Sequence, residues 1–325
     1  MAPPENHSRH SRRRFLHQLL GAGALTLAGL DHGWAQEVVP ARPASFRFAF
    51  LTDLHLLQGG ALRSVEGIVA CLAAVEKLDP RPEFILVGGD LVHSTRDLTL
   101  PGAETAFDFF LKIWNDHTAL PTHWTFGNHD LAGTGNPYAP PTDPEWGKGL
   151  FQERLRLPRL FYSFDCKGWR FVVLDDIVLQ PDHSYYGGLF EEELAFLKAD
   201  LDAHRTTPTI VCTHIPIASN LPLGLLLSRY AGGAQTTIKN LICTNGDALL
   251  ENVPGHNIRA VLAGHLHFHE QIGRNGVRLI NSGAVCGNYW KGPMYGCPEG
   301  FGLVDLGADG SVAFDYRGYG WKASA

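Results

Sequence analysis

The sequence predicts a layered α/β fold with a second β-sheet packed against the first, and three observations support this prediction. Short apolar runs recur along the chain, and each of them ends in polar residues. Segments with the apolar spacing of helices separate the early runs, so strand and helix alternate over the first half. The last third contains mostly strand and turn patterns. With 325 residues and 45% hydrophobic side chains, the chain can bury the large core that such a fold requires.

Five runs rich in branched and aromatic residues have the length of buried strands. They are FRFAFLTDLH from Phe46, FILVGGD from Phe84, THWTFGNHD from Thr122, TIVCTH from Thr209 and IRAVLAGHLH from Ile258. Helices are expected over 61–78 and 190–204, where apolar residues recur on one side. Three further strands are expected in VRLINSG, FGLVDL and SVAFDY. The length and composition predict one large domain, or at most two, and we expect a single domain over 46–318 and a tail over 319–325.

The N-terminus has the pattern of an export signal. SRRRFL at 11–16 precedes an apolar stretch that is too short to span a bilayer, and Gly33 and Ala35 provide a small-residue cleavage pattern. Arg12 and Arg13 resemble the pair of a twin-arginine (Tat) signal, which implies export of the folded protein by the Tat machinery to a periplasmic or extracellular location. A disordered basic tail or an uncleaved anchor are the alternatives. The predicted segments are a signal peptide over 1–35, cleaved near Ala35, and a linker over 36–45.

Charge and cysteine content exclude several classes of protein. The net charge is −6 although the N-terminus is basic, so the body of the chain is a poor general binder of nucleic acid. The six cysteines form no Cys-x-x-Cys pair, which excludes a zinc ribbon and a thioredoxin-type motif. Most are expected to be core thiols. Cys286 and Cys297 bracket a short loop rich in Gly and Pro, and the sequence leaves open whether they form a disulfide.

Polar residues of the same kinds follow the predicted strands. They are Asp53 and His55, Asp90, Asn128 and His129, His214, and His265 and His267. A single Gly-Asp is a common turn, and the histidines of AGHLHFHE at 263–270 could be a solvated strand face. Five such coincidences in one chain are hard to attribute to turns. Carboxylates with histidines and no cysteine suit a pair of divalent ions, and they favour Mn, Fe or Zn.

These residues occur in the order found in the calcineurin-like metallophosphoesterase superfamily, which the chain resembles over about 46–285. The matching motifs are Asp53-x-His55, Gly89-Asp90, Gly127-Asn128-His129-Asp130, His214 and Gly264-His265-x-His267. The resemblance implies a four-layer αββα sandwich of two mixed β-sheets flanked by helices. It also implies two metal ions, with ligands Asp53, His55 and His267 on the first, Asn128, His214 and His265 on the second, and Asp90 bridging both.

The resemblance further implies that His129 stays off the metals and contacts phosphate or protonates the leaving oxygen. Asp90 or Asp130 is expected to assist it. His269 has no place in the pattern, so it is expected to support the ligands or to be solvated. Hydrolysis would proceed by attack of a metal-activated hydroxide on phosphorus.

The implied function is that of an exported dinuclear phosphoesterase acting on a small-molecule or lipid-like phosphoester. We favour a phosphodiesterase because no arginine cluster for a dianionic phosphate is apparent; a phosphomonoesterase, or a metal-bound scaffold retired from catalysis, are the alternatives. Residues 89–94 are Gly-Asp-Leu-Val-His-Ser, whereas many members have Gly-Asp-x-x-Asp-Arg, and this difference argues against a protein phosphatase. Tyr289, Trp290 and Lys291 are expected to rim the cleft, although Trp290 is equally an anchor for its loop, and LPLGLLLS at 221–228 is a candidate lid.

Overall fold

The computed structural model describes residues 44–221 and 238–324, which belong to one compact unit, Arg42–Ala325. The predicted signal peptide, the linker up to residue 43 and residues 222–228 of the candidate lid lie outside the described residues. Within the described part of the chain, no helix has both the length and the hydropathy needed to span a bilayer.

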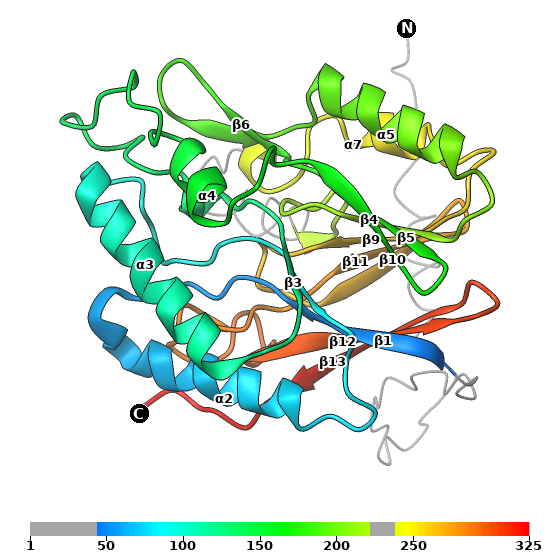
Figure 1. The fold of residues 1–325 in the computed structure, drawn as a ribbon, viewed down its shortest axis with the longest axis horizontal. Helices are drawn as coiled ribbons and strands as arrows, with labels where there is room; N and C mark the ends of the chain where they lie inside the picture. The colour runs from blue at the N-terminus through cyan, green and yellow to red at the C-terminus, as the bar shows by residue number, and fades with distance from the viewer. Residues whose placement is uncertain (1–43, 222–237, 325) are drawn as a thin grey trace, which may run out of the picture. The chain divides into compact units, whose positions relative to one another are not determined.

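Two mixed β-sheets form the centre of the fold (Figure 1). The first has the order β13-β12-β1-β2-β3, and the second has the order β10-β11-β9-β8-β5-β4. The strands of the first sheet are β1 (Ala44–Leu51), β2 (Ile85–Val87), β3 (Thr122–Trp124), β12 (Gly300–Gly307) and β13 (Val312–Gly318). Those of the second are β4 (Tyr162–Cys166), β5 (Trp169–Val173), β8 (Thr209–Cys212), β9 (Ile258–Ala263), β10 (Glu270–Arg274) and β11 (Val277–Asn281). A separate hairpin pairs β6 (Ile177–Leu179) with β7 (Tyr185–Gly187).

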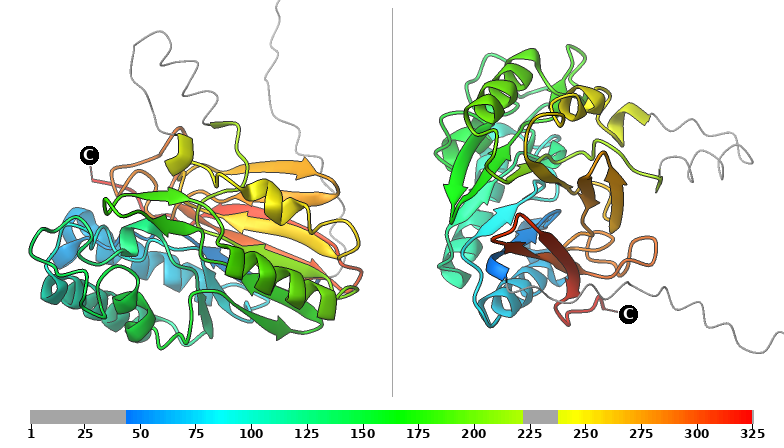
Figure 2. Two further views of the ribbon diagram at one scale, coloured as in Figure 1. Left: turned by 90° about the horizontal axis from the view of Figure 1, so that it is seen from above. Right: turned by 90° about the vertical axis from the view of Figure 1, so that its right-hand side faces the viewer.

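Helices cover the outer face of each sheet. The α-helices are α2 (Ser64–Glu76), α3 (Leu100–His117), α4 (Gly149–Arg154), α5 (Glu191–Ala203) and α7 (Gly246–Leu250), and the 3-10 helices are η1 (Gln58–Arg63), η2 (Asn128–Asp130) and η3 (Ile238–Asn240). Side chains of α2 and α3 pack on the first sheet, and those of α5 and α7 pack on the second. In the right-hand view of Figure 2, α5 lies at the top and α2 at the bottom, with the strands between them.

The alternation of side chains along the strands explains this layering. In β1, Phe48 and Phe50 face the space between the sheets, whereas Ala49 and Leu51 face the helices. Phe48 is fully buried and contacts Phe171 of the second sheet edge to face, with ring centroids 5.4 Å apart. Burying one such side chain contributes about 1.5–3 kcal/mol. The predicted four-layer sandwich of two mixed sheets is therefore confirmed.

Parallel pairing brings the ends of the key strands to the same edge. β1 pairs with β2 and β2 with β3 in parallel, and β8 pairs with β9 in parallel in the second sheet. Parallel strands finish at a common edge, and the crevice outside their carboxyl ends is the usual ligand site of open α/β sheets. The polar residues that follow these strands in the sequence are therefore placed close together.

Several features differ from the sequence-based expectations. Helix α3 was not expected, although Thr99 accepts a hydrogen bond from the Gly102 N–H at its start and Pro101 occupies its first turn, both of which are start signals. Residues beyond β13 form part of the packed unit, because Trp321 is only 9% exposed and contacts the Trp290 ring edge to face. Cys286 and Cys297 are both free thiols, so the disulfide left open by the sequence is not formed.

Candidate metal centre

The loops after five strands bring all seven predicted metal ligands together. Asp53 and His55 follow β1, Asp90 follows β2, Asn128 follows β3, His214 follows β8, and His265 and His267 follow β9. All except His265, which is half-buried, are at most 2% exposed. Burying so many polar side chains is costly unless they pair with one another or bind ions. A cavity of about 210 Å³ adjoins the cluster, and Asp90, Asn128, His129 and His265 line it.

Asp90 lies between two groups of imidazoles. Its Oδ2 is 3.4 Å from His55 Nε2 and 3.3 Å from His214 Nε2, while its Oδ1 accepts a 2.8 Å hydrogen bond from the His129 N–H. One carboxylate oxygen therefore faces both groups. The predicted bridging role of Asp90 requires this arrangement.

The side chains that the resemblance assigns to two different ions lie on two sides of Asp90. On the first side, His267 Nε2 is 3.1 Å from His55 Nε2 and 3.4 Å from Asp53 Oδ1. On the second side, Asn128 Oδ1 is 3.0 Å from His214 Nε2. A ring nitrogen of His265 lies within 4.8 Å of a carboxylate oxygen of Asp90 and of a ring nitrogen of His214. Carboxylate, amide and imidazole donors grouped in this way fit two divalent ions.

Backbone carbonyls fix the orientation of three of these imidazoles. The pairs are His214 Nδ1 with Gly88 O at 2.7 Å, His267 Nδ1 with Gly287 O at 2.5 Å, and His265 Nε2 with Asn240 O at 2.6 Å. A carbonyl can only accept, so each of these ring nitrogens carries the proton. The other nitrogen of each ring is then the one that could bind a metal in exchange for a proton, which is the usual arrangement around metal-bound histidines.

The backbone is strained at most of these positions. The φ angle is positive at Asp53 (55°), His55 (43°), Asp90 (56°), His265 (68°) and His267 (53°). Left-handed backbone at residues other than glycine costs about 1–3 kcal/mol each and clusters at functional sites. Five of the seven predicted ligands thus have a conformation that their residue types disfavour.

Two glycines permit the close approach of the loops. A Cβ at Gly127 would lie 2.2 Å from the Asp90 nitrogen, and one at Gly264 would lie 2.0 Å from Thr52 Oγ1. Thr52 Oγ1 also donates a 2.7 Å hydrogen bond to Asp53 Oδ2. A larger residue at either glycine would therefore displace groups that position a ligand carboxylate.

Asp130 and His93 position the neighbouring groups. The Asp130 carboxylate accepts hydrogen bonds from the N–H groups of Asp90 (3.0 Å) and Gly127 (3.1 Å). Asp90 Oδ1 accepts from the His129 backbone N–H, whereas the ring is held by a carbonyl: His129 Nδ1 donates to the His93 carbonyl oxygen. Assistance to His129 by Asp90 or Asp130 stays a prediction. Sequence reasoning missed this role of His93, because a backbone carbonyl leaves no signal in residue type.

The electrostatics of the cluster favour bound positive charge. Burial opposes ionisation of Asp53, but His267 outweighs it and lowers the pKa of Asp53 to about 2. Burial likewise disfavours charge on His214, yet Asp90 raises the pKa of His214 to about 10. Burial and the charge of His214 lower the pKa of His265 to about 4. Burial also opposes ionisation of Asp90, but His214 and His129 hold the pKa of Asp90 well below its usual range. The ligand carboxylates of Asp53 and Asp90 are therefore ionised at neutral pH and attract cationic partners.

The three residues expected at the rim have different positions. Tyr289 lines the cavity, and its ring centroid is 4.7 Å from those of both His55 and His267. Trp290 is 1% exposed and its indole N–H donates to the His55 carbonyl at 2.9 Å, so it anchors the loop and the expectation that it contacts substrate is wrong. Lys291 is exposed and does not line the cavity.

His269 serves the packing of the fold. It stacks on Phe314 and Tyr316 with ring centroids 5.2 Å and 5.3 Å away, and its Nδ1 pairs with the Asn281 carbonyl at 3.1 Å. It contacts none of the predicted ligands through a hydrogen bond or ring contact in the described part of the chain. His269 is half-buried, so its ring combines a packing contact with partial exposure to solvent.

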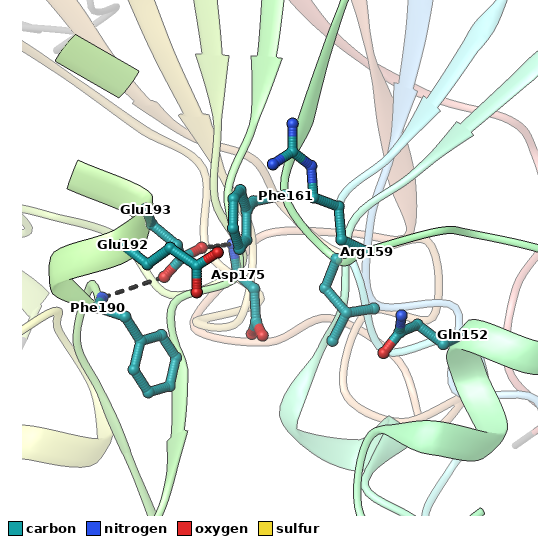
Figure 3. A pocket seen from close by; sticks show the side chains of 8 residues that line it. Gln152, Arg159, Phe161, Asp175, Phe190, Glu192 and Glu193 are labelled. Carbon is teal, nitrogen blue, oxygen red and sulfur yellow. Dashed lines mark hydrogen bonds between the residues drawn. The ribbon is translucent and has the colours of Figure 1, made fainter. Parts of the chain in front are cut away.

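A larger cavity of about 380 Å³ lies elsewhere and is shown in Figure 3. Two of its three acidic groups, Glu193 and Asp175, already have partners. Glu193 accepts hydrogen bonds from the N–H groups of Asp175 (2.6 Å) and Phe190 (3.1 Å), and Asp175 forms a 2.5 Å ion pair with Lys148. None of the predicted metal ligands lines this cavity, so its size does not make it the functional site.

Comparisons with known proteins agree with this geometry. The family model described as calcineurin-like phosphoesterase matches residues 46–269. A cAMP/cGMP dual specificity phosphodiesterase of Mycobacterium tuberculosis is 24% identical over 242 residues, covering 73% of this chain and 66% of the relative. The serine/threonine-protein phosphatase CPPED1 of Bos taurus is 26% identical over 198 residues, covering 60% of this chain and 56% of the relative. A dimetal phosphatase structure from Danio rerio superposes with a TM-score of 0.61 at 15% identity, covering 85% of this chain and 97% of that chain.

Replacement of single histidines tests the division between ligands and other residues. We expect His267→Ala to reduce the metal bound per protein, because it removes one of the ring nitrogens that would hold the first ion. His129→Ala should leave the metal content nearly unchanged, although His129 lies close enough to His55 and Asp90 to join them as a ligand. Elemental analysis after loading with Mn²⁺ measures both. Equal metal loss in the two variants would contradict the assignment.

Proposed function

The chain belongs to the calcineurin-like phosphoesterase family, and from this membership we propose that it is an exported dinuclear phosphodiesterase of small or medium substrates. The family is metal-dependent, with a dinuclear centre. The position of Asp90 Oδ2, 3.4 Å from His55 Nε2 and 3.3 Å from His214 Nε2, is the observation on which the dinuclear proposal rests. The chain spans 66% and 56% of the two curated relatives named above, so their activities are not transferred whole.

Residues of the chain would provide two separate contributions to hydrolysis. Two bound ions would lower the pKa of water and neutralise charge on the phosphate. Asp53, His55, Asp90, Asn128 and the histidines at 214, 265 and 267 would hold these ions. The Nδ1 of His129 is committed to the His93 carbonyl, so its Nε2 is the nitrogen that can carry a proton toward the departing oxygen.

The lining of the cavity supports a diester as the substrate. Among the described residues that line it, none is lysine or arginine. A phosphodiester carries one negative charge and a monoester up to two, so the monoester has the greater need for such cations. The relatives include a phosphodiesterase and a phosphatase by name, and the second keeps a phosphomonoesterase as the alternative. A metal-bound binding scaffold without catalytic activity is disfavoured because His129 and every predicted ligand are present.

Turnover of a substrate panel tests the diester preference. We expect the Mn²⁺-loaded protein to hydrolyse an aryl diester, a cyclic nucleotide or a glycerophosphodiester with a higher kcat/KM than an aryl monoester, because the cavity offers little charge for a dianion. Protein stripped of metal by a chelator is the control and should be inactive. A clear preference for the monoester would favour the phosphomonoesterase, and turnover of no phosphoester would favour the scaffold.

The leaving group separates the two candidate roles of His129. An alkyl alkoxide needs a proton to depart, whereas nitrophenolate departs readily without one. General acid catalysis contributes about 10²- to 10⁴-fold in rate. We therefore expect His129→Ala to lower kcat for an alkyl diester far more than for a nitrophenyl diester, with metal content unchanged. If both substrates slow by the same factor, His129 positions or stabilises phosphate instead.

The export proposal rests on residues 1–35 of the sequence, outside the described residues. Arg12 and Arg13 support recognition by the Tat machinery, and a folded protein exported in this way can carry metal acquired beforehand. N-terminal sequencing of the protein recovered from the periplasm or medium should give a start near Gln36. Recovery of a protein that still begins at Met1 would contradict cleavage, and recovery only from the cytoplasm would contradict export.

A further inference from the structure

Tyr289 lines the cavity, and its hydroxyl has no role in the metal centre described above. Its ring lies 4.7 Å from the rings of His55 and His267 and 6.2 Å from that of His129, measured between centroids. The side chain therefore lies beside the first group of ligands and near the predicted acid. Its hydroxyl forms no hydrogen bond with any residue of the described part of the chain, although a tyrosine hydroxyl usually finds a partner when the ring is largely buried.

The loop that carries Tyr289 is fixed from both sides. The next residue, Trp290, is buried and donates its indole N–H to the His55 carbonyl, and its ring packs closely on Gly67 of α2. On the other side, the Gly287 carbonyl accepts from His267 Nδ1. Both attachments end on predicted metal ligands, so the position of Tyr289 is set relative to the metal centre.

The backbone of this loop is also strained. The φ angles of Tyr289 and Trp290 are 50° and 67°, and bulky aromatic residues rarely adopt the left-handed region. Such strain is retained where the surrounding contacts determine the conformation, and it clusters at ligand sites. Here it places an aromatic ring with a free hydroxyl against two buried imidazoles.

We propose that the Tyr289 hydroxyl donates a hydrogen bond to a non-bridging oxygen of the substrate phosphoryl group. This inference rests on the proposed phosphoesterase function and adds a catalytic residue to it. A phosphoryl group at the centre carries negative charge on oxygens that face the cavity wall, and no lysine or arginine of the described residues lines that wall. A neutral hydroxyl fixed beside the first ligand group supplies a donor without adding the positive charge that would favour a dianion.

Removal of this hydroxyl tests the proposal through phosphate binding. Tyr289→Phe keeps the ring against His55 and His267, so metal content and thermal unfolding should match those of the unchanged protein. The Kd for inorganic phosphate, measured by titration calorimetry on the Mn²⁺-loaded protein, should rise roughly 10- to 100-fold, as expected for loss of a hydrogen bond to a charged group. Tyr138→Phe, at a tyrosine that is 87% exposed and does not line the cavity, is the matched control and should bind phosphate normally.

Turnover distinguishes this role from that of His129. A donor to a non-bridging oxygen acts whatever the leaving group, so Tyr289→Phe should slow alkyl and nitrophenyl diesters by the same factor. Unchanged phosphate affinity in Tyr289→Phe, or its failure to fold, would overturn the proposal, and so would the lack of phosphate binding by the unchanged protein. Turnover of no phosphoester by a protein that binds phosphate through Tyr289 would instead overturn the proposed function alone.

Discussion

The arrangement of the whole site depends on Asp90, whose carboxylate is held in the space between the ends of the two sheets. Its Oδ1 is fixed by the His129 N–H, which leaves Oδ2 to face His55 from the first sheet and His214 from the second. The Asp130 carboxylate accepts from the Asp90 N–H and so fixes its backbone as well. Because the two imidazoles come from different sheets, the packing of one sheet on the other sets the distance between the two groups of ligands.

The buried charges impose a further constraint on the fold. Carboxylates that are at most 1% exposed, such as Asp53 and Asp90, are tolerated only where positive charge and hydrogen bonds compensate for lost hydration. In the chain itself that compensation comes from histidine protons, as the pKa of about 10 for His214 indicates. Metal ions would replace these protons, so metal binding and proton release are expected to be coupled in this centre. The hydrogen bonds and charge pairs of the cluster also hold the left-handed backbone at five of the ligands.

The sequence predicts side-chain chemistry better than backbone roles. The strands that end in Asp53, Asp90 and His214 were predictable because their apolar runs and the motif order are both visible in residue types. The His93 carbonyl, which holds His129, has no such signature, since any residue at position 93 supplies a carbonyl. His269 follows the two ligand histidines at the same spacing, yet the chain turns after Gly264 and places it against Phe314. Residue spacing cannot show where left-handed backbone breaks the alternation of a strand.

Adjacent residues of one loop show how the metal centre and the substrate surface are joined. The Trp290 indole N–H donates to the backbone carbonyl of His55, and the Gly287 carbonyl accepts from Nδ1 of His267. Two predicted ligands are therefore hydrogen-bonded to this loop through atoms that do not face the metal centre. Tyr289 lies between these attachments and lines the cavity. The loop therefore cannot shift without moving an imidazole of the first ligand group. A substitution in this loop that alters substrate preference is accordingly expected to alter metal affinity too. The exception is a substitution that removes only atoms with no hydrogen bond to His55 or His267, such as the Tyr289 hydroxyl.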